Sequence, residues 1–546
     1  MFRLPIEYVQ HDNVQESMVT DLELIHAAEG KPMCDCLYGP TTDRGVQIVK
    51  RAASIYTTDV AYLRDTVKWI AKDRFQRYDT NPFADIWKRH HDTTEFNTLY
   101  HYIEHEKLEF LNKVPIVLLI LSIYSITSPV MFLLSPLFIL LFPFLMLNMT
   151  GRKVDWSSYK STLFDVMKKH ALGGLIIGLK EANTNQIITG LLTAGLFGVQ
   201  VYSNIQSCIQ FYKSLSQVHN MLETTGAYLE HVTSMMAATK ETAPKSYTTF
   251  ANEVDSNRVV LLGILQKVKK IHRMSHSFTE MKQIGRMRQL FYELRHNAAW
   301  RSAIDYALQF SGYTETVLHL HELLHKKVIA PCAFGKKKEK MVGGYYPPHP
   351  DNKRHTYNMK NYMITGPNAA GKTTFIKTTM LNVLFSQQVG CGFYKRFYLK
   401  SPYTKLFCYL NIPDTSGRDS LFQAEARRCK EVLDEVVTGE KTLCIFDELF
   451  SGTNPSDASA SAYAFLQYLK TLPNVTFLLT THFLDVCDRL DNDIQNAHMT
   501  TTKTTSGDLE YTYKFAMGIS KVKGALKVLK DLNYPTSILD CAQKFL

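Results

Sequence analysis

The chain has 546 residues, of which 45% are hydrophobic, and it carries a formal net charge of +11. This length predicts two or three domains, and the hydrophobic content excludes a globally disordered protein. The charge permits contact with nucleic acid or anionic lipid without requiring either. The ten cysteines are scattered without paired zinc spacing, which disfavours a disulfide framework and favours a reducing compartment.

Residues 1–112 are predicted to be helical. Within residues 46–56 and 60–70, apolar side chains recur at three- and four-residue intervals, which is the period of an amphipathic helix. No secretory signal is expected, because residues 1–10 lack an apolar stretch. Four histidines have no acidic or cysteine partners at metal spacing and are expected to be solvated: His90, His91, His101 and His105.

Residues 114–151 contain no charged residue and no histidine. A membrane-crossing helix needs about 20 apolar residues, so this run is longer than one span and short for two spans with a turn. Basic residues lie on both sides, at Lys113 and Arg152, which suits a hairpin whose ends share one face of a bilayer. We therefore expect membrane association of residues 114–147. A weaker apolar stretch follows at 187–202, with small residues suited to helix packing. The alternative is a buried hairpin in a soluble helical domain.

Residues 205–330 again show the amphipathic period, at 205–222, 254–273 and 281–324. No strand pattern precedes residue 331. The basic run at 336–340 is typical of a solvated loop, with a lipid or DNA contact as the alternative.

A phosphate-binding loop is predicted at residues 366–373, which fit the pattern G-x-x-x-x-G-K-[ST] between an apolar run and a helix start. Glycines at both ends allow a tight turn in which backbone N–H groups point at phosphate oxygens. Lys372 would reach the β- and γ-phosphates, and the Thr373 hydroxyl would bind Mg²⁺. The alternative is an ordinary turn before a helix. The candidate nucleotide-binding residues are Gly366, Pro367, Asn368, Ala369, Ala370, Gly371, Lys372, Thr373 and Thr374.

Two apolar strands downstream end in catalytic residue types. Asp447 and Glu448 follow the run 443–446, at the strand end where parallel sheets bind ligands. Asp447 would hold Mg²⁺, and Glu448 would position or deprotonate the attacking water. His482 follows the run 475–480 and could hydrogen-bond the γ-phosphate. The predicted catalytic residues are Glu448, His482 and Lys372, and the predicted metal ligands are Thr373 and Asp447.

These residues resemble the MutS mismatch-repair ATPases. The segments that carry the resemblance lie in the family's order, from about residue 340 to 546: residues 365–374, 388–391, 416–425, 446–454, 480–483 and 518–535. The sequence from 412 to 425 is most similar to that of short MutS-like proteins of large DNA viruses.

The resemblance implies an ABC-like P-loop ATPase that uses ATP and Mg²⁺ and works as a dimer, here expected to be a homodimer. Ser420 and residues 451–454 would face the nucleotide bound by the other subunit, and Tyr346 would stack on adenine. The family's lever helices and DNA clamp would correspond to the helical blocks and the apolar insert. No mismatch-reading module and no Phe-x-Glu segment is found, so DNA binding stays open and mismatch specificity is doubtful.

The expected fold is multidomain, α plus α/β. It consists of a lever-like helical region at 1–112, an apolar insert with a membrane-type hairpin at 113–204, a second lever-like region at 205–330 and the ATPase domain with C-terminal dimerisation helices at 331–546. The expected function is a membrane-tethered dimeric nucleotide switch with its ATPase domain on the cytosolic side. The alternative is a soluble DNA mismatch-repair or recombination factor in the cytoplasm, the nucleus or a viral factory, with the insert buried in protein. A transporter ATPase half is disfavoured, because 419–425 lacks the glycine pair of transporter signatures.

Overall fold

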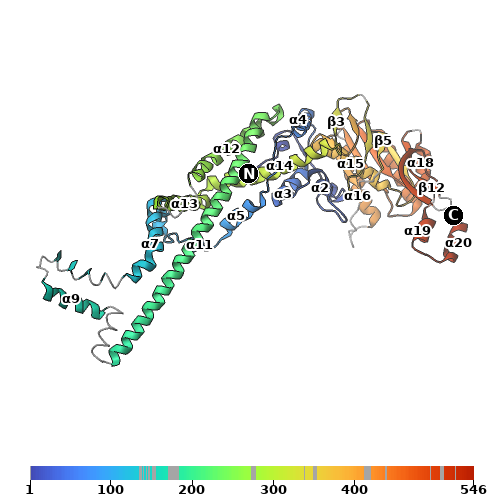
Figure 1. Cartoon of the computed structure of the whole chain (residues 1–546). Helices are drawn as coiled ribbons and strands as arrows, with labels where there is room; N and C mark the ends of the chain where they lie inside the picture. The colour runs from blue at the N-terminus through green and yellow to red at the C-terminus, as the bar shows by residue number, and fades with distance from the viewer. Residues whose placement is uncertain are drawn as a thin grey trace. The chain divides into compact units, whose positions relative to one another are not determined.

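The computed structural model describes residues 2–134, 155–169, 184–271, 278–336, 338–348, 353–410, 420–436, 439–491, 493–503, 509–522 and 524–545, with 138, 141–142, 144–145 and 148–149. The chain divides into two compact units (Figure 1). Unit 1 comprises Met1–Asp79, Ser234–Arg258 and Asp305–Leu546, and unit 2 comprises Thr80–Thr233 and Val259–Ile304. Three long helices contribute residues to both units: α11 (Thr184–Thr242), α12 (Thr248–Lys269) and α14 (Ala298–His325).

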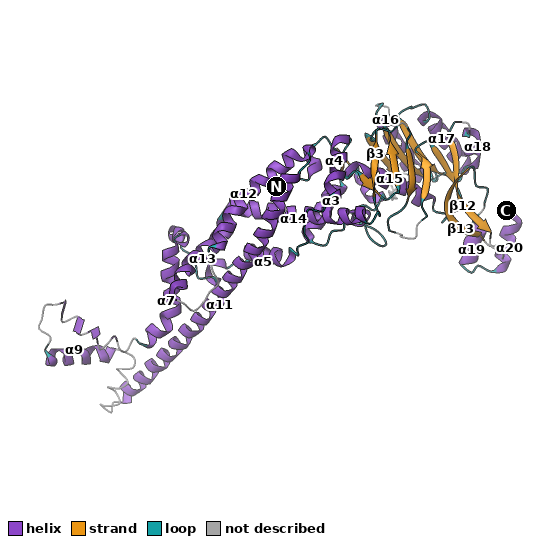
Figure 2. Cartoon of the chain, turned by 45° about the horizontal axis from the view of Figure 1, so that its top comes forward, coloured by secondary structure: helices purple, strands orange, loops and turns teal. Residues whose placement is uncertain are grey.

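Unit 1 contains a six-stranded sheet with the order β13-β12-β6-β11-β10-β9 (Figure 2). Each neighbouring pair is parallel except β12 and β13, which are antiparallel. All four residues of β6 are buried, as expected for a parallel strand covered on both faces. The strands predicted at 443–447 and 475–480 are confirmed as β10 and β11. The bounds are β6 (Tyr362–Thr365), β9 (Lys405–Tyr409), β10 (Thr442–Asp447), β11 (Val475–Thr480), β12 (Gln495–Lys503) and β13 (Leu509–Met517).

Helices cover this sheet. Apolar residues of three helices pack with β10 and β11 in one core cluster, and these helices are α16 (Leu421–Val436), α17 (Pro455–Leu469) and α18 (Leu484–Leu490). The helix α15 (Lys372–Gln388) also packs against β10 and β11 and is almost wholly buried. Two short helices, α19 (Ala525–Asp531) and α20 (Thr536–Phe545), end the chain.

A second sheet of unit 1 has the order β5-β4-β8-β3-β7. Its strand β5 leads directly into β6, so the second sheet brings residues to the start of the predicted phosphate loop. The bounds are β3 (Ala330–Phe334), β4 (Lys340–Gly344), β5 (His355–Asn358), β7 (Cys391–Gly392) and β8 (Arg396–Leu399).

The N-terminal part of unit 1 is helical, with one correction to the expectation that no strand precedes residue 331. Asp12 and Asn13 pair antiparallel with Tyr56 and Ile55, which forms a two-residue ladder too short to leave a periodic pattern. The elements are η1 (Pro5–Tyr8), β1 (Asp12–Asn13), α1 (Glu16–Asp21), α2 (Met33–Tyr38), α3 (Asp43–Ala53), β2 (Ile55–Tyr56), α4 (Val60–Ala71) and η3 (Lys245–Tyr247).

The far end of α15 is fixed to these N-terminal helices. The Gln388 amide donates to the carbonyl oxygens of Ala52 at 2.8 Å and Ile55 at 3.0 Å, and it accepts from the Tyr38 hydroxyl at 3.2 Å. Since these groups are buried, losing a partner would leave an unsatisfied polar atom. The N-terminal helices are therefore part of the same compact unit as the phosphate-loop helix.

Unit 2 is helical in its described residues. Besides its shares of α11, α12 and α14, it contains α5 (Asn81–Asp92), α6 (Phe96–Leu99), η2 (Glu106–Lys113), α7 (Pro115–Leu133), α9 (Trp156–Lys169) and α13 (Phe278–His296). One prediction was wrong: His90 is only 4% exposed and packs edge-on against Phe291, with ring centroids 4.5 Å apart. Its burial follows from the packing of α5 on α13, which local sequence does not reveal.

Two helices are long and apolar enough to cross a membrane by length and composition: Pro115–Leu133 and Ile187–Thr242. They coincide with α7 and most of α11. The turn of the hairpin expected within 114–147 lies outside the continuously described residues. Helix α11 passes through residues 204 and 205 without a break, so the expected boundary there is not a break in secondary structure.

Candidate nucleotide-binding site

The loop between β6 and α15 has the backbone of a phosphate cradle. Gly366 and Gly371 have φ values of 145° and 91°, and Ala369, which is not glycine, has a φ of 62°. Helix α15 begins at Lys372, as the sequence predicts, so its free N–H groups face the loop. Backbone N–H groups at a helix start, together with the helix dipole, favour an anion at this position.

Lys372 is the buried cation of the loop, with 5% of its surface exposed. Its ammonium donates to the carbonyl oxygen of Gly366 at 3.0 Å and lies 3.0 Å from Nε2 of His482. Burial lowers the pKa of Lys372, while the charges of Glu448 and Asp447 oppose this shift. A phosphate bound in the loop would supply the negative charge that a buried ammonium needs.

The two predicted metal ligands face one another. The Thr373 hydroxyl donates to Oδ2 of Asp447 at 2.8 Å, and the Thr480 hydroxyl donates to the other carboxylate oxygen. Asp447 ends β10 and Thr480 ends the neighbouring β11, so both lie at the carboxyl edge of the parallel sheet. Oxygen donors of this kind suit Mg²⁺, which usually takes one or two protein ligands beside phosphate and water.

Glu448 and His482 meet beside Lys372. His482 Nε2 lies 3.0 Å from Glu448 Oε1 and 2.9 Å from Oδ1 of Asn368. The hydrogen bond from His482, followed by the charges of His482 and Lys372, lowers the pKa of Glu448. Glu448 is thus an ionised carboxylate at neutral pH, which a general base requires. Its φ of 51° is a strained backbone conformation of the kind found at functional sites.

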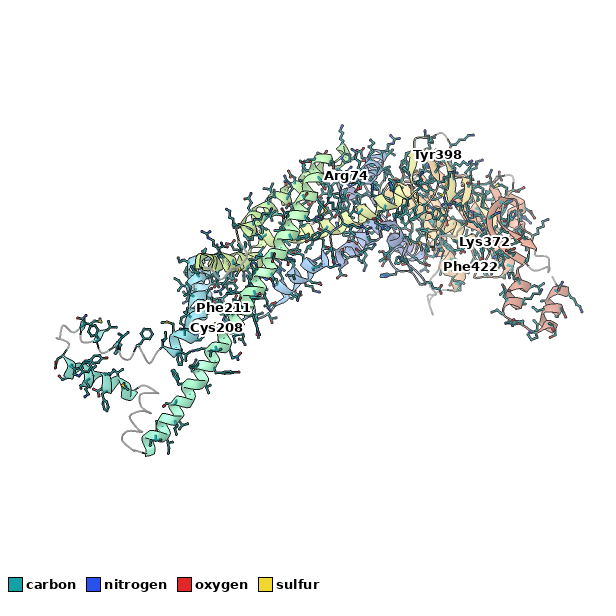
Figure 3. The ribbon with its side chains drawn as sticks, viewed as in Figure 1. Arg74, Cys208, Phe211, Lys372, Tyr398 and Phe422 are labelled. Carbon is teal, nitrogen blue, oxygen red and sulfur yellow. The ribbon has the colours of Figure 1, made fainter. Side chains whose placement is uncertain are left out.

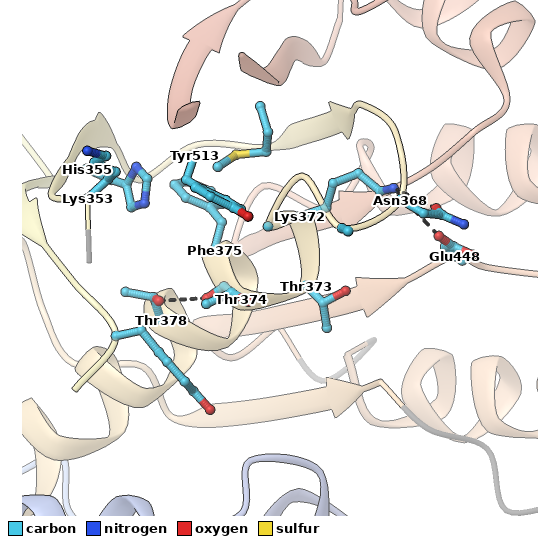
Figure 4. A pocket seen from close by; sticks show the side chains of 14 residues that line it. Lys353, His355, Asn368, Lys372, Thr373, Thr374, Phe375, Thr378, Glu448 and Tyr513 are labelled. Carbon is cyan, nitrogen blue, oxygen red and sulfur yellow. Dashed lines mark hydrogen bonds and ion pairs between the residues drawn. The ribbon is translucent and has the colours of Figure 1, made fainter. Parts of the chain in front are cut away.

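These side chains line a cavity of about 690 Å³ (Figure 4). The cavity includes Asn368, Ala369, Gly371, Lys372, Thr373, Thr374 and Glu448 from the predicted set, together with Tyr346. The volume lies in the range of small-molecule and cofactor sites. Tyr346 is half-buried there, and burial raises its pKa to about 12, so its phenol stays neutral.

Sequence reasoning missed six residues of this cavity: Lys353, His355, Phe375, Thr378, Met499 and Tyr513. The Tyr513 ring lies so close to the loop that a Cβ on Gly371 would be 3.1 Å from its Cδ1 atom. The register of β12 and β13 shifts between Met499 and Thr501, and Tyr513 has a φ of 53°. This irregularity turns the ring toward the loop. Only the dense aromatic content of 511–515 could have suggested such a role.

Five predicted residues do not line the cavity themselves but adjoin residues that do: Gly366, Pro367, Ala370, Asp447 and His482. Ser420, in contrast, makes no hydrogen bond to a lining residue among those that the structure describes. It is exposed and caps α16. The backbone N–H of Gln423 donates to the Ser420 hydroxyl at 3.3 Å, and the backbone N–H of Ser420 donates to Oε1 of the Gln423 side chain at 2.9 Å. The buried Glu425 carboxylate fixes the loop 451–454, because it accepts hydrogen bonds from the N–H and the hydroxyl of Ser451, both at 3.0 Å. Asn454 caps α17.

The described arrangement is that of an α/β domain with a phosphate-type loop at the carboxyl edge of a parallel sheet. Residues 362–546 match the family model for MutS domain V. The chain is 31% identical to the human MutS protein homolog 4 over 192 residues, which cover 32% of this chain and 19% of that protein. It is 26% identical to endonuclease MutS2 of Thermus thermophilus, over 54% of this chain and 39% of that protein. It is 24% identical to the DNA mismatch repair protein MutS of Bacillus cereus, over 61% of this chain and 38% of that protein.

The similarity to the MutS family model is thus shown for residues 362–546. The chain spans between about a fifth and two fifths of the length of these curated relatives. The similarity to the viral proteins noted from residues 412–425 stays a prediction.

Proposed function

We propose that this chain is an ATPase of the MutS type that binds ATP with Mg²⁺ and works as a dimeric nucleotide switch. One observation carries the proposal. Lys372, Thr373 and the ionised Glu448 line one cavity beside a glycine-bounded loop, and His482 and Asp447 lie within hydrogen-bond distance of them.

Each side chain has a chemical role in this proposal. The loop N–H groups and Lys372 bind the phosphates, and Thr373 with Asp447 holds Mg²⁺, which supplies charge neutralisation at the β- and γ-phosphates. Glu448 takes the proton of the attacking water, and His482 hydrogen-bonds the γ-phosphate region. Tyr513 and Tyr346 contribute aromatic surface to the same cavity, on which a base would stack.

Replacing two residues tests this assignment. Lys372→Ala should abolish ATP binding, because the phosphates lose their buried cation. Glu448→Gln should retain binding and lower the rate of hydrolysis about 10²–10⁴-fold, because the water loses its base. Binding is measured by calorimetry and turnover by phosphate release. Wild-type turnover in Glu448→Gln would show that another group is the base.

The membrane tether is part of the proposal. Its support is the charge-free run from Val114 to Gly151 and the apolar, largely exposed helices α7 and α11. In this arrangement the ATPase unit stays on the cytosolic side. Membrane flotation of the full chain tests the tether independently of turnover.

A DNA role is the second candidate function, and the similarity to a mismatch repair protein and to an endonuclease favours it. Binding would be directed at the DNA backbone, which basic side chains contact without reading the bases. Salt-dependent binding that is equal for matched and mismatched duplexes is the expected result. A clear preference for a mismatch would instead favour a repair factor proper.

A further inference from the structure

Helices α7 and α11 of unit 2 run side by side in opposite directions. Phe132 of α7 stacks on Phe197 of α11 with ring centroids 4.9 Å apart, and Sγ of Cys208 lies 3.5 Å from the carbonyl oxygen of Ile126. The C-terminal part of α7 thus contacts the N-terminal part of α11, so the two helices are antiparallel. Figure 3 labels Cys208 and Phe211 on this stretch of α11.

A buried arginine joins both helices at one end of the pair. Arg288 of α13 donates to the carbonyl oxygen of Leu118 and the hydroxyl of Ser122 on α7, and its guanidinium lies 5.3 Å from the Phe211 ring centroid of α11. It also donates to the carbonyl oxygens of Tyr100 and His101. Exposed charged residues stand near this end, at Lys113 just before α7 and at Arg286 on α13. The Arg288 end of the pair is therefore the aqueous end.

Away from Arg288, the outer faces of both helices are apolar and exposed. Tyr124 of α7 is 70% exposed and Leu196 of α11 is 68% exposed, and the two helices also expose Val130, Met131, Leu133, Ile188, Leu191, Leu192, Val199 and Tyr202. Only 11% and 6% of the most apolar windows of the two helices are buried, so these stretches are not part of the core of this unit.

Polar side chains on these helices are satisfied without water. The hydroxyls of Ser122, Ser125 and Thr127 on α7 donate to carbonyl oxygens one turn earlier, and so does Thr193 on α11. Such internal bonds are what hydrocarbon surroundings require.

The charge-free length beyond the Arg288 level is similar on both sides. In the sequence, the charge-free stretch on the α7 side extends from Ile123 to Gly151, of which α7 itself comprises the part to Leu133, and on the α11 side it extends back from Gln210 to Ala182. Each exceeds the roughly 20 residues that cross a bilayer as a helix. If a single bilayer surface lies near Arg288, the two charge-free stretches that start there are expected to have equal lengths.

We propose that α7 and the first half of α11 enter a lipid bilayer together as one two-helix anchor, with the Arg288 level at its surface. This proposal rests on the membrane tether proposed above and deepens it. It makes α11, whose sequence alone is the weaker membrane signal, as necessary as α7.

The test uses three matched substitutions in the full chain, each placing glutamate at an exposed apolar position of unit 2. Leu133→Glu lies on α7, Leu196→Glu lies on α11, and Val259→Glu on α12 is the control, at 60% exposure and outside the pair. Flotation is measured with vesicles of phosphatidylcholine and phosphatidylglycerol. The first two variants should each lose tenfold or more of the bound fraction, and the control should bind like wild type. Unchanged circular dichroism and ATP binding exclude misfolding.

The outcomes separate the two proposals. Wild-type protein that never floats would overturn the tether and the anchor together, while ATP hydrolysis would be untouched. Loss of flotation in Leu133→Glu with full flotation of Leu196→Glu would overturn the two-helix anchor alone. If the wild type were instead a soluble oligomer that Leu196→Glu dissociates, the exposed apolar surface of α11 would bind a second copy of the chain, and the anchor would be overturned. Insertion is confirmed if the fluorescence gained over wild type in Leu196→Trp, but not that gained in Val259→Trp, is quenched by brominated lipid.

Discussion

Tyr513 shows how one strained residue can define an end of the cavity. A tyrosine at a positive φ is uncommon, and here it coincides with an irregular register beside a glycine loop. The surrounding strands must hold this conformation against its cost of about 1–3 kcal/mol. We therefore infer that this backbone conformation orients an aromatic ring toward the proposed nucleotide site.

Removing this ring should weaken nucleotide binding without affecting the chemical step. Base–aromatic stacking contributes about 1–3 kcal/mol, so Tyr513→Ala should raise the Kd for ATP about 5- to 150-fold. Tyr513→Phe keeps the ring and should bind ATP normally. Tyr511→Ala is the control, because Tyr511 lies on the same strand outside the cavity. Equal Kd values for Tyr513→Ala and wild type would show that Tyr513 does not stack on the base.

The packing of α5 on α13 depends on a histidine that must stay neutral. Neither ring nitrogen of His90 has a hydrogen-bond partner among the described residues. Burial, and then the nearby charges of His91, Arg295 and His296, lowers the pKa of His90 to about 2. In the unfolded chain His90 would bind a proton near pH 6.5, whereas in the folded chain it stays neutral. The free energy of unfolding is therefore largest above that pH and falls as the pH drops below it.

His90→Phe should remove this acid sensitivity. Between pH 7.5 and pH 5, the wild type should lose about 2 kcal/mol of unfolding free energy more than the variant, which is about 1.5 pH units at 1.36 kcal/mol each. Urea unfolding at both pH values measures the difference. His105→Phe is the control, since His105 is exposed. Parallel losses in His90→Phe and wild type would contradict a neutral, buried His90.

At the level of the whole molecule, the start of α16 and the loop 451–454, which follows Asp447 and Glu448, are joined by direct contacts into one block. The Glu425 carboxylate accepts from Ser451 and from the Gly452 N–H at 3.1 Å, and a Cβ on Gly452 would lie 2.6 Å from Leu421 Cγ. Neither Ser420 nor this loop lines the cavity of its own chain. That arrangement is compatible with the proposed dimer, in which the block faces the partner's nucleotide.

Mixing two inactive variants tests this composite site. Lys372→Ala lacks ATP binding, and Ser420→Ala retains it, so a mixed dimer pairs one intact phosphate loop with one intact Ser420. Activity should exceed the average of the separate variants, because one complete site is restored. A mixture of Lys372→Ala with the double variant serves as the inactive control. Mere averaging after proven subunit exchange would leave Ser420 as a helix cap only.

The catalytic side of the site could be predicted because its signals are local. The loop 366–373 encodes its own turn and helix start, and the acids and His482 each follow an apolar strand directly. In a parallel sheet those strand ends share one edge, so residues distant in sequence are placed together by a general rule.

The remaining features depend on contacts between distant segments with no local pattern. His355 and Tyr513 reach the cavity from two different strands, and His90 is buried by Phe291 from another helix. The pairing of Phe132 with Phe197 turns two apolar stretches into one element. Local sequence thus determined the phosphate loop, its acids and the apolar segments, because each is a property of a few consecutive residues. Only tertiary packing decided which ring faces the nucleotide, which histidine is neutral and which helices act together, because side-chain burial is set by neighbours that the chain supplies from elsewhere.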